Sequence, residues 1–325
     1  MRAIVHDRYG SPDVLKLTDV EVPTPAEHQV LVKVHAAAAN PLDWHFMRGS
    51  PFVVRLQAGL SKPKDPRLGA DVAGVVEAAG RDVTAFKPGD AVFGSVGKGA
   101  FAEYACAREN ALAPKPENLT FEQAAAVPVV GFTALQGLRD AGNIQSGESV
   151  LVNGASGGVG TFAVQLAKSY GTEVTGVCST RNVELVRSLG ADHVIDYTQA
   201  DFTQDGGRYD LIYDAVGNRS VSDLKRALRP GGRCVIVGFT TMSRLVRHMI
   251  FGPLTSRTGD KTIGLMGTAQ PNQDDLTHIT ELLEEGRVVP VIDRQCPLAE
   301  TAEAIRYLET GRVRGKVVIT IGHST

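Results

Sequence analysis

Apolar residues in the middle of the chain follow two periods, one typical of buried strands and the other of helices. Continuous apolar runs at residues 149–152 and 174–178 predict two strands that are buried on both faces. Between these runs, apolar residues recur at the spacing of one helical face, at Val159, Phe162, Ala163, Leu166 and Ala167. The order strand, helix, strand predicts a parallel βαβ unit.

This alternation of strand and helix continues to residue 266. Further strands are predicted at residues 193–196, 211–216, 233–238 and 262–266. With the first two they make six, the number in a complete doubly wound sheet.

The first part of the chain has shorter and more irregular patterns. Residues 1–124 contain short strands separated by turns, and Val30, Val32 and Val34 alternate as in a half-buried strand over residues 29–37. The segment that follows this strand is predicted to be a loop. Helices are predicted at residues 121–126, 131–141, 276–285 and 301–310, and a last strand at residues 316–321.

The strand at 149–152 leads into a glycine-rich turn, Gly154-Ala155-Ser156-Gly157-Gly158-Val159-Gly160, that opens the helix. The first N–H groups of a helix have no intrahelical partner, and the aligned peptide dipoles make this end partly positive. A side chain at Gly157 or Gly158 would keep a phosphate away from the backbone, whereas Gly160 lets the helix pack closely on the strand. We therefore expect Ser156, Gly157, Gly158 and Val159 to contact the pyrophosphate of a dinucleotide.

The end of the second strand indicates which dinucleotide. An NAD site usually carries an acid there, but residues 178–182 read Cys-Ser-Thr-Arg-Asn. A hydroxyl at Ser179 and the guanidinium of Arg181 favour the 2′-phosphate of NADPH, because Arg forms paired, charge-assisted hydrogen bonds with phosphate oxygens. The same residues can also simply cap the next helix, and both roles are compatible.

Composition excludes several other classes of function. The net charge of −2 gives no basic excess for nucleic acid, and no apolar run is long enough to span a membrane. The four cysteines lie far apart and form no C-x-x-C pair, so neither a disulfide framework nor a thiolate zinc site is indicated. The N-terminus has no signal or transit character, and we expect a cytoplasmic protein.

Several motifs together resemble one known family. They are Asn40-Pro41-Leu42-Asp43, Leu68–Gly74, Lys87–Val92, Ala125–Pro128, Gly131–Ala134, the Gly154–Gly160 turn and Leu189–Asp192. In this order they resemble the medium-chain dehydrogenase/reductases, in the zinc-independent quinone oxidoreductase branch. The resemblance implies an α/β protein: a GroES-like β-barrel catalytic domain (1–124 plus 268–325) with an inserted doubly wound Rossmann domain that binds NADPH (125–267). It also implies an active site in a cleft between the domains, and a homodimer.

Zinc-dependent members of this superfamily carry Cys at the place of Asn40 or Pro41, and Gly-His-Glu at the place of Gly69-Ala70-Asp71. Neither is present here. A catalytic zinc needs three protein ligands, which His45 alone does not supply. We therefore expect no metal.

The resemblance also implies site residues. Asn40 and Asp43 match positions near the nicotinamide and the substrate, although an Asn-Pro turn and a helix cap are alternative roles. Trp44 and His45 stand where relatives often have a Tyr, so Trp44 is a candidate pocket wall and His45 a candidate proton relay. Further cofactor contacts are expected from Thr133, Tyr197, Val216, Gly217, Gly238, Phe239 and Arg314, with Arg312 and Lys316 as alternatives to Arg314.

The predicted reaction is transfer of hydride from NADPH to a quinone or an α,β-unsaturated carbonyl without a metal. Without zinc, acceptors with a conjugated and therefore less basic oxyanion are favoured. The alternatives are alcohol or aldehyde oxidoreduction, and binding of NADPH without turnover. The segment 242–257 is apolar with interspersed Arg, and an ordinary helix at the domain edge is preferred over contact with a membrane.

Overall fold

The computed structural model describes residues 1–204 and 206–323, with the backbone alone described at residues 254–258. The chain divides into two compact units. The first comprises Met1–Val129, Pro271–Gly286 and Pro290–Thr325, and the second Val130–Gln270 and Arg287–Val289. The junctions fall a few residues after the boundaries expected from the sequence, and residues 287–289 return to the second unit.

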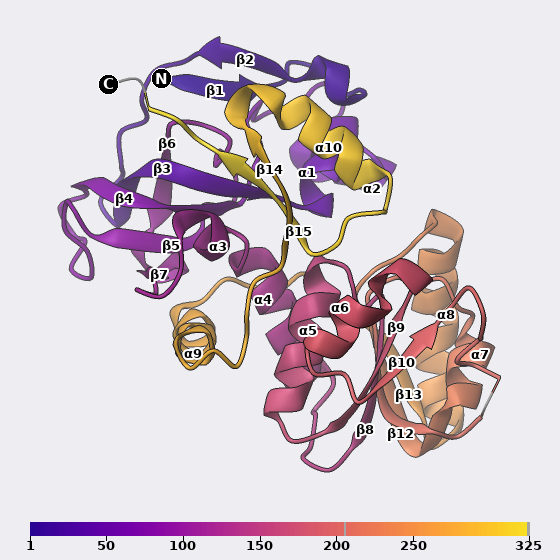
Figure 1. The fold of residues 1–325 in the computed structure, drawn as a ribbon. Helices are drawn as coiled ribbons and strands as arrows, with labels where there is room; N and C mark the ends of the chain where they lie inside the picture. Colours follow the sequence, from indigo (N-terminus) through magenta and orange to yellow (C-terminus); the bar gives the residue numbers. More distant parts are fainter. Residues whose placement is uncertain (205, 324–325) are drawn as a thin grey trace. The chain divides into compact units, whose positions relative to one another are not determined.

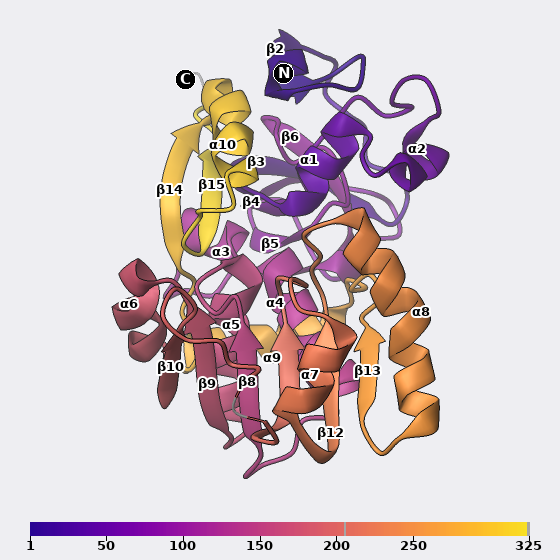
Figure 2. The same ribbon diagram turned by 90° about the vertical axis from the view of Figure 1, so that its right-hand side faces the viewer.

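The second unit is built on a six-stranded parallel sheet in the order β10-β9-β8-β11-β12-β13 (Figure 2). Its strands are β8 (Ser149–Asn153), β9 (Glu173–Cys178), β10 (His193–Asp196), β11 (Tyr209–Asp214), β12 (Leu228–Ile236) and β13 (Thr262–Leu265). This is the order of a complete doubly wound sheet, whose ligand crevice lies where the order reverses, between β8 and β11. The six predicted strands are therefore confirmed, each within a few residues.

Helices connect these strands. They are α4 (Pro128–Gln136), α5 (Gly158–Ser169), α6 (Val183–Ser188), α7 (Val221–Ala227) and α8 (Met242–Thr258), and α4 carries the chain into this unit. The predicted apolar face of α5 is buried, with Phe162, Ala163 and Leu166 at most 1% exposed. Residues 242–258 form one helix, α8, packed beside the edge strand β13 (Figure 2).

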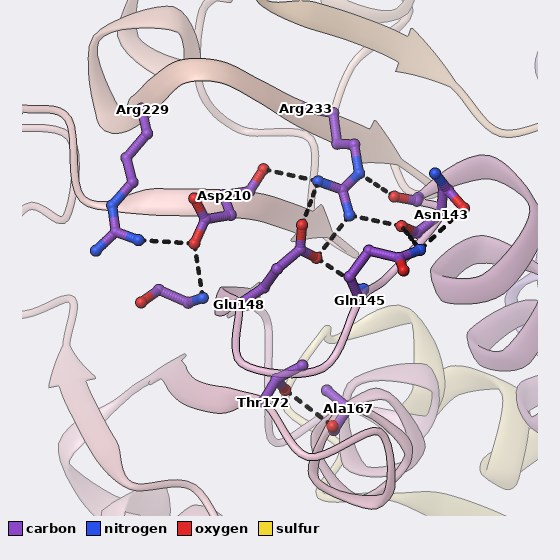
Figure 3. A network of polar contacts seen from close by, with 10 residues as sticks. Asn143, Gln145, Glu148, Ala167, Thr172, Asp210, Arg229 and Arg233 are labelled. Atoms are coloured by element: carbon purple, nitrogen blue, oxygen red, sulfur yellow. Dashed lines mark hydrogen bonds and ion pairs between the residues drawn. The ribbon is translucent and has the colours of Figure 1, made fainter.

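A network of hydrogen bonds and ion pairs connects β12 to the loop before β8 (Figure 3). The guanidinium of Arg233 on β12 donates to both carboxylate oxygens of Glu148, at 2.8 and 2.6 Å, and to the backbone carbonyls of Gly142 and Asn143. A bidentate, half-buried pair of this kind fixes geometry better than an exposed ion pair. It holds the loop before β8 against β12, at the opposite end of the sheet from the glycine turn.

The first unit contains a seven-stranded sheet and a two-stranded one (Figure 1). The larger has the order β14-β15-β3-β4-β5-β7, and β6 also pairs with β3. Its strands are β3 (Gln29–Ala39), β4 (Asp71–Ala79), β5 (Ala91–Ser95), β6 (Tyr104–Arg108), β7 (Leu112–Pro114), β14 (Ile292–Pro297) and β15 (Lys316–Thr320). The smaller pairs β1 (Arg2–Val5) with β2 (Lys16–Asp19). Val30, Val32 and Val34 of β3 are fully buried in the core, as their alternation predicted.

The helices of this unit are α1 (Pro41–Arg48), α2 (Phe52–Ala58), α3 (Phe121–Ala125), α9 (Gln273–Glu284) and α10 (Thr301–Glu309). The prediction of a loop after β3 is wrong, because residues 41–48 form α1. Asn40 is its N-cap, Pro41 its first residue, and Gly49 ends it in the left-handed conformation at φ 57°. The backbone N–H of Asn40 donates to Asp43 at 2.8 Å, which completes a capping box.

Within the part of the chain that the structure describes, no helix is long and apolar enough to cross a membrane.

Candidate nucleotide site and the buried network near α1

The glycine turn has the shape that a dinucleotide requires. Gly154 adopts φ +84°, which side chains disfavour, and a Cβ at Gly160 would lie under 3.0 Å from the Gly154 carbonyl. At Gly157, by contrast, a Cβ would meet only that carbonyl, at 3.5 Å. Gly160 is therefore needed for packing within the protein, whereas the space beside Gly157 is open.

The N-terminus of α5 is not capped by a side chain. Gly157 is the N-cap and makes no side-chain hydrogen bond, and Gly158 and Val159 begin the helix. The partial positive charge and the first N–H groups of the helix are then available to an anion. These features fit the pyrophosphate of a dinucleotide.

Two serines and an asparagine meet beside this turn. Ser156 lies in the turn, Ser179 directly follows β9, and Asn182 ends the short helix Thr180–Asn182. The Nδ2 group of Asn182 donates to Ser156 Oγ at 2.9 Å and to Ser179 Oγ at 3.3 Å. The structure therefore brings together two predicted contacts, Ser156 and Ser179, through a residue that the sequence analysis did not select.

Tyr197 lies close to the same strand end, since its backbone N–H donates to the Cys178 carbonyl at 3.0 Å. Its side chain is 56% exposed. Arg181 is exposed and lies in the short helix Thr180–Asn182. Arg314 is also exposed but belongs to the first unit, where its N–H donates to Asp293.

A buried carboxylate occupies the switch point between β8 and β11. Asp214, at the end of β11, is fully buried, and its Oδ1 accepts from Asn153 Nδ2 at 2.8 Å and from the N–H groups of Val216 and Gly217. Its Oδ2 has no hydrogen-bond partner within the described chain. Asp214 and Asn153 were missed because their positions at two strand ends become significant only when the strands are adjacent.

The loops after β11 and β12 pack against each other at two predicted positions. Gly217 adopts φ +64°, and a Cβ there would lie under 3.0 Å from the Gly238 carbonyl. Phe239 follows Gly238 in this loop, and Val216 precedes Gly217. The backbone carbonyl of Thr133 on α4 accepts from the Tyr213 hydroxyl at 2.9 Å, which ties α4 to β11.

In the first unit, two other predicted residues belong to a buried network. Asn40 Nδ2 donates to Asp71 Oδ2 at 2.9 Å, and Lys316 Nζ donates to Asn40 Oδ1 at 2.6 Å and to Asp71 Oδ2 at 3.1 Å. Asp71 Oδ1 accepts from the N–H of Val129 at 2.8 Å. Lys316 is 3% exposed, which places its ammonium in this network.

Asp43 supports the same region. It is 4% exposed, and its carboxylate oxygens accept from the N–H groups of Asn40 and Gly69 at 2.8 and 2.9 Å. Burial raises the pKa of Asp43 to about 7, although both N–H groups act in the opposite direction. Asn40 is the N-cap of α1, and its N–H donates to Asp43 in the first turn, so this pair fixes the start of the helix.

The raised pKa of Asp43 predicts a dependence of stability on pH. An unfolded chain releases this proton near pH 4 and the folded protein only near pH 7, so the contribution of Asp43 to stability falls as the pH rises through this window. Asp43→Asn cannot ionise. We expect the free energy of unfolding of the native protein, relative to that of Asp43→Asn, to fall by about 3 kcal/mol between pH 4.5 and 8. Urea unfolding followed by the fluorescence of Trp44 measures this, and parallel pH profiles would contradict it.

Trp44 and His45 differ from Asn40 and Asp43, since both are half-buried. Their rings stack at 3.7 Å. His45 Nδ1 donates to the Ser50 carbonyl at 2.6 Å, and burial lowers the pKa of His45, outweighing that carbonyl. His45 is therefore neutral at neutral pH, with the proton on Nδ1 already engaged.

Across residues 1–204 and 206–323, no three His, Cys, Asp or Glu side chains lie together as a metal would need.

Comparison with known proteins agrees with this architecture. A family model described as an alcohol dehydrogenase GroES-like domain matches residues 26–117, and one described as a zinc-binding dehydrogenase matches residues 189–319. The chain is 36% identical to quinone oxidoreductase of Rattus norvegicus, covering 99% of this chain and 98% of that protein. It is also 36% identical to NADPH-dependent alkenal/one oxidoreductase, chloroplastic, of Arabidopsis thaliana, over 98% of this chain and 79% of that protein.

Among solved structures, quinone oxidoreductase from Coxiella burnetii superposes with a TM-score of 0.88 at 35% identity, covering 99% of both chains. The predicted fold class, a GroES-like domain with a doubly wound Rossmann sheet, is thereby confirmed. Full-length identity of this size, together with the glycine turn and the strand order of the second unit, shows that the chain belongs to the medium-chain dehydrogenase/reductase family, in its quinone oxidoreductase-like branch.

Proposed function

We propose that this protein is an NADPH-dependent oxidoreductase that reduces quinones or α,β-unsaturated carbonyls without a metal. The observation that carries the proposal is the open glycine turn at the uncapped N-terminus of α5, beside the hydroxyls of Ser156 and Ser179. The names of the relatives above support the reaction class.

The preference for NADPH rests on the end of β9. NADPH, when bound, supplies the hydride. Residues 178–182 offer hydroxyls, a guanidinium and an amide but no acid to accept from a ribose 2′-hydroxyl. Asp196, on the neighbouring strand β10, accepts from the Thr180 and Thr198 hydroxyls at 2.5 and 2.8 Å. In this proposal Ser179 and Arg181 bind the 2′-phosphate, and Tyr197 contacts the adenosine.

The other cofactor contacts stay as predicted from the sequence. Gly158 and Val159 present backbone N–H groups to the pyrophosphate, and Gly157, whose own N–H donates to the Gly154 carbonyl at 3.0 Å, lets the pyrophosphate approach closely. Thr133, Val216, Gly217, Gly238 and Phe239 approach the nicotinamide ribose and ring. Arg314 is proposed as a further phosphate contact. Lys316 is not, because its ammonium is held by Asn40 and Asp71.

On the substrate side, the stacked Trp44–His45 pair is proposed to meet the flat acceptor, since aromatic faces bind conjugated rings well. Asn40 and Asp43, at the start of α1, stay proposed as residues near the nicotinamide and the substrate. Because the neutral His45 has its Nδ1 proton on the Ser50 carbonyl, it has to take up a proton before it can pass one to a reduced substrate. Conjugated acceptors suit such a site, because their oxyanions are weakly basic.

Oxidation of NADPH, followed at 340 nm, tests the proposal. A quinone, a short enone and an aldehyde are compared, each with and without EDTA and with NADH in parallel. We expect turnover of the quinone or the enone that survives EDTA and prefers NADPH. EDTA-sensitive reduction of the aldehyde would favour a zinc-dependent alcohol dehydrogenase, and tight binding of NADPH without turnover would favour a binding protein.

A cytoplasmic homodimer is proposed as the working form. Two features at one edge of the sheet support the homodimer. β13 is the last strand in the order of the sheet, and the neighbouring α8 exposes Val246, Met249, Ile250 and Phe251 by 44–60%. Analytical ultracentrifugation tests the dimer.

A further inference from the structure

We propose that Asn182 is the positioning residue that turns Ser156 and Ser179 into donors for phosphate, and thereby sets the preference for NADPH. This inference rests on the proposed function, since it concerns the same nucleotide site. It names a residue outside the glycine turn and the 2′-phosphate contacts assigned above.

The direction of the hydrogen bonds carries the argument. A serine hydroxyl has one proton to donate and two lone pairs to accept with. The Asn182 amide donates to Ser156 Oγ at 2.9 Å and to Ser179 Oγ at 3.3 Å, so both hydroxyls act as acceptors toward it. Each serine therefore keeps its own proton for another partner.

Burial protects these hydrogen bonds from competition with water. Asn182 is 4% exposed and Ser156 9% exposed, so water competes poorly for the amide. Moreover, Asn182 Oδ1 is buried with no hydrogen-bond partner in the described chain. A purely structural asparagine would be expected to have both ends of its amide paired, because a buried unpaired oxygen is destabilising.

The two serines belong to different parts of a nucleotide. Ser156 lies in the glycine turn, where the pyrophosphate is expected, and Ser179 directly follows β9, where the 2′-phosphate is expected. With the N-terminus of α5, the oriented hydroxyls make this corner rich in donors. Such a corner favours a ligand with two separate phosphate groups over one that lacks the 2′-phosphate.

Asn182→Asp inverts the arrangement with almost no change of shape. The new carboxylate accepts from both serine hydroxyls, which takes away their protons, and adds a negative charge beside the phosphates. We expect the Kd of NADPH to rise about 100-fold and that of NADH about 10-fold, because charge-assisted hydrogen bonds to phosphate are lost. The Kd of 2′,5′-ADP should rise in parallel with that of NADPH.

Ser188→Asp is the matched control. It adds the same charge at the other end of α6, on an exposed side chain whose hydroxyl donates to the Leu185 carbonyl. Its Kd values should stay within about twofold of those of the native protein. Asn182→Ala is the second variant, should Asn182→Asp fail to fold. Without adding charge, it should weaken the binding of NADPH more than the binding of NADH.

Fluorescence titration and calorimetry with NADPH, NADH and 2′,5′-ADP give the answer without any need for turnover. An unchanged ratio of NADPH to NADH affinity in a folded Asn182 variant would overturn the inference, while leaving the proposed function intact. If the native protein binds neither nucleotide, the proposed function itself is refuted.

Discussion

Gly157→Ala is expected to abolish tight binding of NADPH while leaving the fold almost unchanged. The added methyl group would meet only the Gly154 carbonyl, at 3.5 Å, which is ordinary van der Waals contact. The same methyl group would occupy the open side of the turn, where a pyrophosphate has to approach the backbone N–H groups. We expect the Kd of NADPH to rise by about 100-fold or more and the melting temperature without nucleotide to fall by no more than about 3 °C.

Gly160→Ala is the matched control, three residues further along the same turn. Its Cβ would lie under 3.0 Å from the Gly154 carbonyl and from the Ala155 backbone, so the turn has to move. Stability and binding should then be lost together. Full NADPH affinity in a folded Gly157→Ala protein would contradict the assignment of the pyrophosphate to this turn.

Lys316→Met should destabilise the first unit by about 4 kcal/mol. Removing the ammonium leaves the fully buried carboxylate of Asp71 without its counter-charge, and breaking a buried ion pair from one side typically costs about 3–5 kcal/mol. The protein has a single tryptophan, Trp44, and it lies on α1 next to this network. Urea unfolding followed by its fluorescence therefore reports on this unit.

The double variant Lys316→Met/Asp71→Asn should recover much of the lost stability. The amide introduced by Asp71→Asn keeps an oxygen for the Val129 N–H, and the Asn40 amide is free to turn over once Lys316 no longer donates to it. The two amides can then pair without any buried charge. A double variant no more stable than Lys316→Met would show that the unpaired charge of Asp71 is not what destabilises the single variant.

The sequence predicted the second unit well because its signals are local. Each strand is a continuous apolar run, the glycine turn is a short motif, and Phe162 and Leu166 mark the buried face of α5 within a few residues. The first unit was harder. The start of α1 carries a clear pattern in Asn40, Pro41 and Asp43, but eight residues give too little apolar periodicity to distinguish a short helix from a loop.

Contacts between residues that lie far apart in the chain could not be predicted from the sequence. Ser156 and Asn182 are 26 positions apart, and Lys316 and Asp71 are 245 apart. The sequence around one residue of each pair therefore does not indicate the other. The same separation explains why the hydrogen bond between Lys316 and Asn40 was not expected from the sequence. Their burial follows from the pairing of β15 with β3 and of β3 with β4, which no local pattern indicates.

The Lys316 network also bears on how a metal enzyme of this family would be built from this chain. Zinc-dependent members carry their ligands at the places of Asn40 or Pro41 and of Gly69–Asp71, and here a lysine ammonium lies within 3.1 Å of Asn40 and Asp71. An ammonium repels a divalent cation and engages the oxygens around it. Introducing cysteine and histidine alone would therefore leave the bound zinc ion next to an ammonium. A redesign toward zinc therefore has to replace Lys316 first, although it lies 245 positions from Asp71 in the sequence.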